Sequence, residues 1–347
     1  MNKRVIEILI FSLIGLTSCS LQDDPPEPFY DNFLSSKGLF VLNEGNFMAG
    51  NGSVSFYSTD SMKIYNDIFS NANSRPIGDV PNHMGIIGDR AFIVVNNSGK
   101  IEVTSCKTMK SIAVIPGLTS PRQILFINNN KAYVSSLYST KIIVINLENY
   151  TINSYIDIRR TSESMILCEG KAYISCWSGG DELVVVDTSS DTVIDSVKVG
   201  HEPESMVIDR NGKLWVLCSG SYTGEFYPEL VVINTVTDSV EKKFQFGSKL
   251  MYPCCLKING TGDTIYYIER SIWRMAVTSD QLPAEPFIRA SGRNFYKIGV
   301  EPESGRLYAT NAIDYQQKGF LLIFNRDGTV ADSVKVGIIP GYICFKQ

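Results

Sequence analysis

Histidine is scarce in this chain. The 347 residues include only two, His83 and His201, and they lie in parts of the chain that do not neighbour each other in the repeat pattern described below. Metal binding and histidine-based catalysis need several such side chains to converge. No CxxC pair and no Cys/His cluster with zinc spacing occurs either. The sequence therefore predicts neither a metal site nor catalytic residues.

Long hydrophobic runs and an excess of basic charge are also missing. The formal net charge is −4, which argues against nucleic acid or an anionic lipid surface as the partner. The longest apolar run, residues 5–16, is too short to cross a bilayer as a stable helix. Helical periodicity is absent outside this run, and no glycine-rich loop leads from a strand into a helix. A nucleotide-binding phosphate loop is therefore not expected.

What the chain does have is an internal repeat. An aromatic residue within a short apolar strand, preceded by a tight turn, recurs at intervals of 40 to 52 residues. The seven copies are Phe40, Phe92, Tyr133, Tyr173, Trp215, Tyr266 and Tyr308. A second column keeps phase with the first and reads VPNHM, SPRQI, TSESM, EPESM, YPCCL, FYKI and IPGYI. Two columns in phase across seven copies indicate a real structural repeat.

Four short strands in each of seven units predict an all-β, seven-bladed β-propeller over residues 37–347. Wholly apolar runs such as LVVVD and LVVIN fit strands buried on both faces. An open solenoid is the competing repeat fold. The first unit lacks the innermost strand, whereas the chain ends in a matching segment. We therefore expect residues 341–346 to supply that strand and close the ring.

The first 36 residues carry targeting signals. Lys3 and Arg4 precede the apolar run, which predicts a signal peptide over residues 1–19. The sequence Leu-Thr-Ser-Cys at its end resembles a bacterial lipobox, so we expect Cys19 to be lipidated and to tether the protein to a membrane. Asp23 and Asp24 just after it resemble the acidic surface-export signals of Bacteroidetes lipoproteins, which implies an outer-membrane lipoprotein that faces the cell exterior. An ordinary signal peptide is the alternative. Residues 20–36, acidic and rich in proline, are expected to form a linker.

Seven cysteines remain once Cys19 is set aside. An odd number leaves at least one of them without a partner in the same chain. We expect most of them to be small buried hydrophobic residues. Disulfides stay possible because the protein is expected to be exported.

Long loops favour one face of the predicted propeller. The connections after the second strand of a blade and those between blades emerge on the same side, and these are the long ones. They combine flat aromatic side chains with amides and hydroxyls, which suits a large neutral ligand. The candidate ligand-binding residues are Asn43, Asn46, Asn96, Asn97, Tyr138, Trp177, Ser178, Ser219, Tyr222, Phe226, Tyr227, Asn311 and Tyr315. Packing or turn formation is the alternative role for each of them.

Charged candidates are few. Of Glu202 and Glu204, we expect one to point to solvent and the other to rim the channel. Arg122, Arg270 and Arg293 are isolated arginines that could bind an anion. No charged cluster is expected around the channel, which argues against an enzyme.

The opening GLFVLNEGNFMAGNGSVSFYS, the Asn96-Asn97-Ser98 segment, SPRQI and the NGK turns resemble the propeller lipoproteins of Bacteroidetes with the DUF5074 or YncE/YVTN-like pattern. Within that group the chain is most similar to the cobalamin-binding BtuG family. The resemblance implies capture of cobalamin or another corrinoid, without a catalytic cofactor, and transfer to a TonB-dependent outer-membrane transporter. A propeller that binds a glycan, a peptide or an envelope protein is the alternative. A lactonase-like or quinoprotein-like enzyme is a third.

Overall fold

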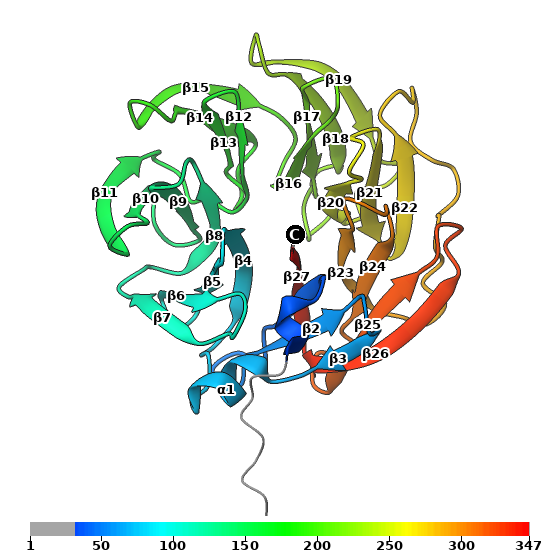
Figure 1. Cartoon of the computed structure of the whole chain (residues 1–347). Helices are drawn as coiled ribbons and strands as arrows, with labels where there is room; N and C mark the ends of the chain where they lie inside the picture. The colour runs from blue at the N-terminus through cyan, green and yellow to red at the C-terminus, as the bar shows by residue number, and fades with distance from the viewer. Residues whose placement is uncertain (1–31, 347) are drawn as a thin grey trace, which may run out of the picture. The chain divides into compact units, whose positions relative to one another are not determined.

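The computed structural model describes residues 32–346, which form seven small antiparallel sheets arranged in a ring (Figure 1). Each sheet is one blade, with its innermost strand against the central axis. The innermost strands of blades one to seven are β27(Pro340–Lys346), β4(Pro81–Ile87), β8(Pro121–Phe126), β12(Met165–Cys168), β16(Pro203–Ile208), β20(Cys254–Ile258) and β23(Phe295–Val300). The predicted seven-bladed propeller is therefore confirmed.

The remaining strands follow outward in each blade. The second strands are β1(Gly38–Asn43), β5(Arg90–Val95), β9(Lys131–Ser136), β13(Lys171–Ser175), β17(Lys213–Cys218), β21(Thr264–Glu269) and β24(Leu307–Asn311). The third strands are β2(Ser53–Ser58), β6(Lys100–Ser105), β10(Lys141–Asn146), β14(Glu182–Asp187), β18(Glu229–Asn234), β22(Ser271–Ala276) and β25(Lys318–Phe324). The outer strands are β3(Lys63–Tyr65), β7(Ser111–Ile115), β11(Thr151–Asp157), β15(Thr192–Lys198), β19(Ser239–Gln245) and β26(Val330–Ile338).

The repeated aromatic residue lies on the second strand of every blade and is buried in all seven. Large side chains at this position fill the space between blades, where the hydrophobic clusters lie. One such cluster joins Val185 of the fourth blade to Val231 of the fifth. Because both faces of most blades are covered by neighbours, the second and third strands are apolar throughout rather than alternating.

The C-terminal strand closes the ring. Strand β27 pairs antiparallel with β1, with Val41 opposite Ile343 and Phe40 opposite Cys344. The first and last segments of the propeller therefore share one sheet, as the sequence predicts. This pairing removes the exposed sheet edge that an open arrangement would leave.

Polar bridges also join consecutive blades. The Lys171 ammonium group lies 2.7 Å from both carboxylate oxygens of Asp238 in the next blade, and the Tyr173 hydroxyl donates to the same carboxylate. Lys131 makes the equivalent 2.7 Å contact with Asp191 one blade earlier. These contacts tie the second strand of one blade to the outer turn of the next.

The sixth blade departs from the expected four strands. It contains β20, β21 and β22, and beyond β22 only an isolated bridge joins Ile272 to Ile288. Pro283 and Pro286 precede that bridge. Proline has no N–H to donate to a strand ladder, which explains why an outer strand does not form here.

Two short helical segments were not expected. The helix α1(Ile68–Asn73) follows β3, and a 3-10 turn η1(Asn32–Ser35) precedes β1. Leu34 of this turn packs into the hydrophobic cluster of the first two blades, so the packed region begins before residue 37. The expected signal peptide, Cys19 and most of the linker lie outside the described residues. Within residues 32–346, no helix has the length and apolar character needed to span a membrane.

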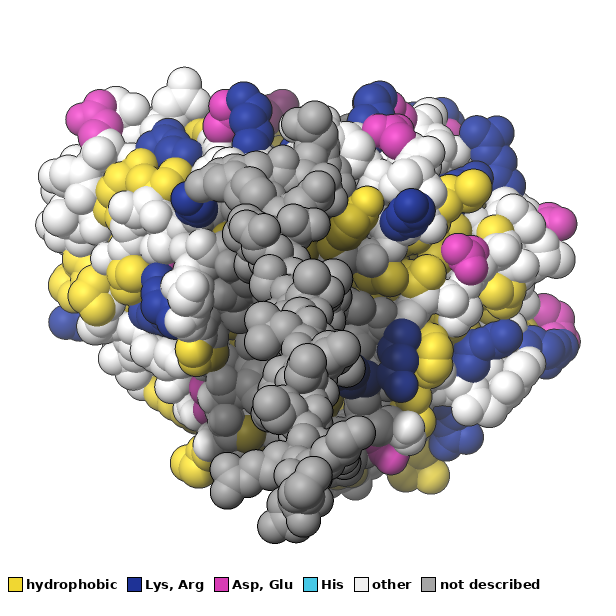
Figure 2. Space-filling view, turned by 60° about the horizontal axis from the view of Figure 1, so that its bottom comes forward, with side chains coloured by type: hydrophobic (Ala, Val, Ile, Leu, Met, Phe, Trp, Pro, Cys, Tyr) yellow, Lys and Arg dark blue, Asp and Glu magenta, His cyan; other side chains and the backbone are white. Residues whose placement is uncertain are grey.

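The visible surface carries mixed charge. Figure 2 shows basic and acidic side chains interspersed, with the hydrophobic ones in small separate groups.

Candidate functional site

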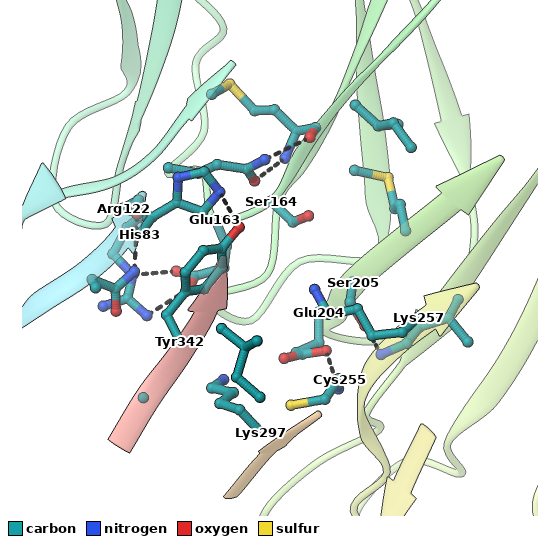
Figure 3. Close-up of a pocket in the computed structure, with 18 of the residues that line it drawn as sticks. His83, Arg122, Glu163, Ser164, Glu204, Ser205, Cys255, Lys257, Lys297 and Tyr342 are labelled. Atoms are coloured by element: carbon teal, nitrogen blue, oxygen red, sulfur yellow. Dashed lines mark hydrogen bonds and ion pairs between the residues drawn. The ribbon is translucent and has the colours of Figure 1, made fainter. Parts of the chain in front are cut away.

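The centre of the ring holds a cavity of about 350 Å³ (Figure 3). All seven blades contribute to its wall, mostly through the first residues of their innermost strands. These residues are the second column of the sequence repeat, from VPNHM to IPGYI. The column therefore marks the wall of a channel as well as the start of a strand.

The channel wall is charged, and the expectation of no charged cluster was wrong. Arg122 donates from Nε and Nη2 to the two carboxylate oxygens of Glu163, at 2.7 and 2.6 Å. Glu204, Lys257 and Lys297 line the same cavity. Blades three to seven supply one each of these five side chains, so they are far apart in the sequence and meet only when the ring closes.

His83 lies in the channel wall on β4, not in an inter-blade loop. Its Nε2 is 2.9 Å from the hydroxyl of Tyr342 on β27, and the two rings lie 4.5 Å apart. The other ring nitrogen, Nδ1, is buried without a hydrogen-bond partner among the described residues. Burial, together with the nearby Lys257 charge, lowers the pKa of His83 to about 3. The imidazole is therefore neutral at physiological pH.

The channel mouth opens on the face that carries the long loops. Glu44 follows β1 at the start of one of these loops, and the Tyr296 hydroxyl from β23 donates to its carboxylate oxygens at 3.1 and 3.2 Å. Burial is the main cause that raises the pKa of Glu44. The loop that carries Asn46 thus contacts the innermost strand of the seventh blade.

Five of the aromatic candidates are exposed around this face. They are Tyr138, Tyr222, Phe226, Tyr227 and Tyr315. Tyr222 is the most exposed of them, at 88 %, and its ring meets Tyr252 edge-on with centroids 6.0 Å apart. The loop of the first blade adds exposed Phe47 and Met48, which are not among the residues predicted from the sequence.

A groove of about 510 Å³ lies beside Phe226 and Tyr227, between the loops of the fourth and fifth blades. Phe226 stacks on His201, with ring centroids 4.1 Å apart and an angle of 26° between the planes. Lys249 lies over the Tyr227 ring at 5.3 Å. His201 therefore supports an aromatic wall of the groove, a role that sequence reasoning missed because the two rings belong to different loops.

Trp177 and Ser178 lie in the loop between β13 and β14. Ser178 is exposed, whereas Trp177 is half-buried. The indole Nε1 of Trp177 is buried and has no hydrogen-bond partner among the described residues. The nearby Glu202 accepts a hydrogen bond of 3.0 Å from the Tyr252 hydroxyl, so it is not free in solvent as one of the two glutamates was expected to be.

The polar candidates mostly hold the loops themselves. Asn43 is fully buried and binds Ser55 and the Gly337 N–H, and Ser219 is fully buried and donates to the Pro253 carbonyl. Neither is accessible to a ligand. The other candidate amides also have partners within the protein. Asn46 donates to the Tyr315 carbonyl, and Asn97 donates to the Asp79 carboxylate. Asn96 donates to the Ser120 hydroxyl and the Pro121 carbonyl, whereas Asn311 accepts from the N–H groups of Asn294 and Ile313.

Of the three isolated arginines, only Arg122 lines the channel. Arg270 lies on the surface with its Nε 3.9 Å from the neighbouring Glu269. Glu204 lines the channel, as expected for one of the two glutamates. Within the described part of the chain, no group of three or more His, Cys, Asp or Glu side chains is arranged to hold a metal ion.

The seven cysteines from Cys106 to Cys344 form no disulfide in residues 32–346, and four of them are fully buried: Cys106, Cys176, Cys218 and Cys255. They occupy positions between or within blades where a small apolar side chain fits. Burial raises the pKa of the Cys344 thiol to about 12, so this thiol stays protonated.

A family model described as a domain of unknown function, DUF5074, matches residues 37–335. The chain belongs to the DUF5074 family. The match covers the propeller from its first strand into the outer strand of the seventh blade. A search of curated proteins finds no match.

Solved structures resemble this DUF5074 chain in fold. A quinoprotein alcohol dehydrogenase-like protein from Bacteroides thetaiotaomicron is 16 % identical, with a TM-score of 0.71 over 90 % of this chain and 78 % of the other. A candidate 6-phosphogluconolactonase from Bacteroides uniformis is 11 % identical, with a TM-score of 0.64 over 90 % and 100 %. A protein of unknown function from Desulfotomaculum acetoxidans is 14 % identical, with a TM-score of 0.67 over 89 % and 99 %. At these identities the likeness concerns the propeller fold alone.

Proposed function

We propose that this protein is a surface lipoprotein that captures cobalamin or a related corrinoid on the loop face and passes it to a TonB-dependent outer-membrane transporter. The proposal involves binding and transfer, with no reaction at the site. It draws on the resemblance to the BtuG family for the ligand and the partner. The lipobox at Cys19 supports attachment to the outer membrane.

The observation that carries the proposal is the gathering of exposed aromatic side chains on one face. Tyr222, Phe226 and Tyr227 lie in one loop, and Tyr138 and Tyr315 lie in loops of other blades on the same side. Aromatic side chains that stay in water are costly unless a partner covers them, and they give large rigid contact areas. A corrin ring is flat and is rimmed with amides, which suits such a surface.

The test is retention of cyanocobalamin by the full-length protein on a desalting column, measured by the red absorbance of the protein fraction. The double variant Tyr222→Ala/Phe226→Ala should weaken binding by roughly tenfold or more, because aromatic anchors carry a large share of binding energy. Tyr155→Ala is the matched control, since Tyr155 is an exposed tyrosine on the outer strand β11, outside the long loops. A wild-type protein that leaves the column colourless contradicts the proposal.

A glycan, a peptide or an envelope protein is the second candidate ligand for the same face. The groove beside Phe226 favours it, because an open groove with an aromatic wall suits an extended chain. A glycan array probed with the full-length protein separates the two. Saturable glycan binding that is lost in Tyr222→Ala/Phe226→Ala, with no retention of cobalamin, replaces the first proposal by the second.

A further inference from the structure

Two lysines point into the central channel without a counter-charge of their own. Lys257 on β20 and Lys297 on β23 belong to neighbouring blades, and both line the cavity. Among the described residues, neither ammonium group has a carboxylate within 4.0 Å or a hydrogen-bond partner. Figure 3 shows both in the wall of the same cavity. The arginine of this channel, by contrast, is fully paired with Glu163.

The two ammonium groups lie over aromatic rings instead of carboxylates. Lys257 Nζ is 5.8 Å from the centroid of Tyr342, and Lys297 Nζ is 5.3 Å from that of Tyr296. The attraction between an ammonium group and an aromatic ring offsets only part of the hydration free energy that the ammonium group loses in a narrow channel. Two such groups at one cavity therefore leave a positive potential that a ligand can neutralise.

The balance of charge in the channel favours an anion. Arg122 and Glu163 neutralise each other, and Glu204 is the remaining carboxylate of the cavity wall. One of its oxygens already accepts the Cys255 N–H at 2.8 Å. Within the cavity lining, two ammonium groups face this one unpaired carboxylate, and the Glu44 carboxylate lies at the mouth, where it interacts with Lys297 and accepts from the Tyr296 hydroxyl. The lining itself therefore carries an excess of one positive charge, which one bound anionic group would balance.

Neutral donors surround the same space. The Ser164 and Ser205 side chains line the cavity, and the Tyr342 hydroxyl lies at its wall beside His83. When His83 carries its proton on Nε2, it donates to the Tyr342 oxygen, and the Tyr342 O–H is then free to donate into the cavity. Hydroxyl donors next to ammonium groups are the usual ligands of carboxylate and phosphate oxygens.

We propose that the central channel is a binding site for a small anionic molecule that carries one carboxylate or phosphate group, held by Lys257 and Lys297. The cavity of about 350 Å³ is within the range of small-molecule sites. It opens on the loop face but is built from the innermost strands, so this site is separate from the exposed aromatic side chains. The proposal does not depend on the identity of the ligand bound on the loop face.

The test is calorimetric titration of the full-length protein at low ionic strength with two probes, inorganic phosphate and acetate. Saturable binding of at least one is expected, and comparison of the two distinguishes a phosphate from a carboxylate site. Lys257→Met and Lys297→Met should each weaken binding by roughly tenfold or more, because each removes one charge-assisted contact. Lys198→Met is the matched control, since Lys198 lies on the outer strand β15 with its side chain 80 % exposed, and it should bind as the wild type does.

Lys297→Arg is a second control, because it keeps the positive charge and should retain binding. It shows whether lost binding in Lys297→Met comes from the lost charge or from misfolding. A wild-type protein that binds neither probe overturns the proposal and means that the channel lysines are simply hydrated. Equal binding by the wild type and both methionine variants also overturns it. The methionine variants should lose phosphate or acetate binding but keep cobalamin retention, and Tyr222→Ala/Phe226→Ala should show the opposite pattern. Either result shows that this site is distinct from the loop face.

Discussion

The hydroxyl of Tyr342 lies 2.9 Å from Nε2 of His83, a residue 259 positions earlier in the chain. This contact joins the C-terminal strand of the first blade to the innermost strand of the second. The contact lies on the strand that closes the ring, and both of its residues line the channel. The stability of the fold and the chemistry of the channel are therefore linked through the last seven residues.

Deletion of residues 341–347 should abolish the cooperative unfolding transition. The deletion removes nearly all of β27 and leaves β1 without its inner partner. Blades at the seam then lose the packing that joins them. Urea unfolding followed by tryptophan fluorescence and by circular dichroism measures the effect. Deletion of Gln347 alone is the control, since β27 ends at Lys346. Identical transitions in the two deletions would contradict closure by the tail.

His83 should make the protein less stable as the pH falls below neutrality. Its pKa is about 3 in the folded protein, against an ordinary value of 6.5. Between pH 6.5 and about pH 3, His83 binds a proton in the unfolded chain but not in the folded protein. The free energy of unfolding therefore decreases as the pH falls through this range. At pH 5 the loss is about 2 kcal/mol relative to neutral pH.

His83→Gln removes this titration. Urea unfolding at pH 7.5 and pH 5 should show a drop in the wild type that exceeds the drop in the variant by about 2 kcal/mol. The comparison between the two proteins cancels the titration of other groups. Equal drops would show that His83 is protonated in the folded protein.

The Arg122–Glu163 pair should show strong coupling. Arg122→Met leaves the Glu163 carboxylate unpaired in the channel and is expected to cost about 2 to 4 kcal/mol of unfolding free energy. The double variant Arg122→Met/Glu163→Met should be less destabilised than the sum of the two single variants. Lys198→Met breaks the exposed pair with Asp181 and should change stability by less than about 0.5 kcal/mol. If the changes in unfolding free energy of the two single variants simply add up in the double variant, water screens the channel pair.

The repeat in the sequence predicts most of the architecture because the repeated residues are those that pack between blades. Phe40 and its six counterparts must be large and apolar to fill the space between blades, so they appear as a column. Residues 341–346 match the start of a blade because they are one. The sixth blade differs because Pro283 and Pro286 prevent an outer strand, a local effect that an alignment of aromatic residues does not register.

The candidate site was harder to predict, for two physical reasons. Asn43 and Ser219 have the chemistry of ligand contacts, but an amide or a hydroxyl at the end of a strand serves equally well to satisfy the backbone of the next loop, and both do so here. The channel charges were overlooked because Arg122, Glu163 and Lys297 lie on three different innermost strands or directly beside them. Only the third and fourth letters of the repeated column could have revealed them.

The pairing of β27 with β1 also sets the order in which the protein can mature. Strand β1 is made first, yet its inner neighbour β27 follows the other six blades in the chain. A chain that is still being synthesised therefore cannot complete the first blade, and the inner edge of β1 stays unpaired until β27 has been made. A chaperone that shields this edge would act on β1.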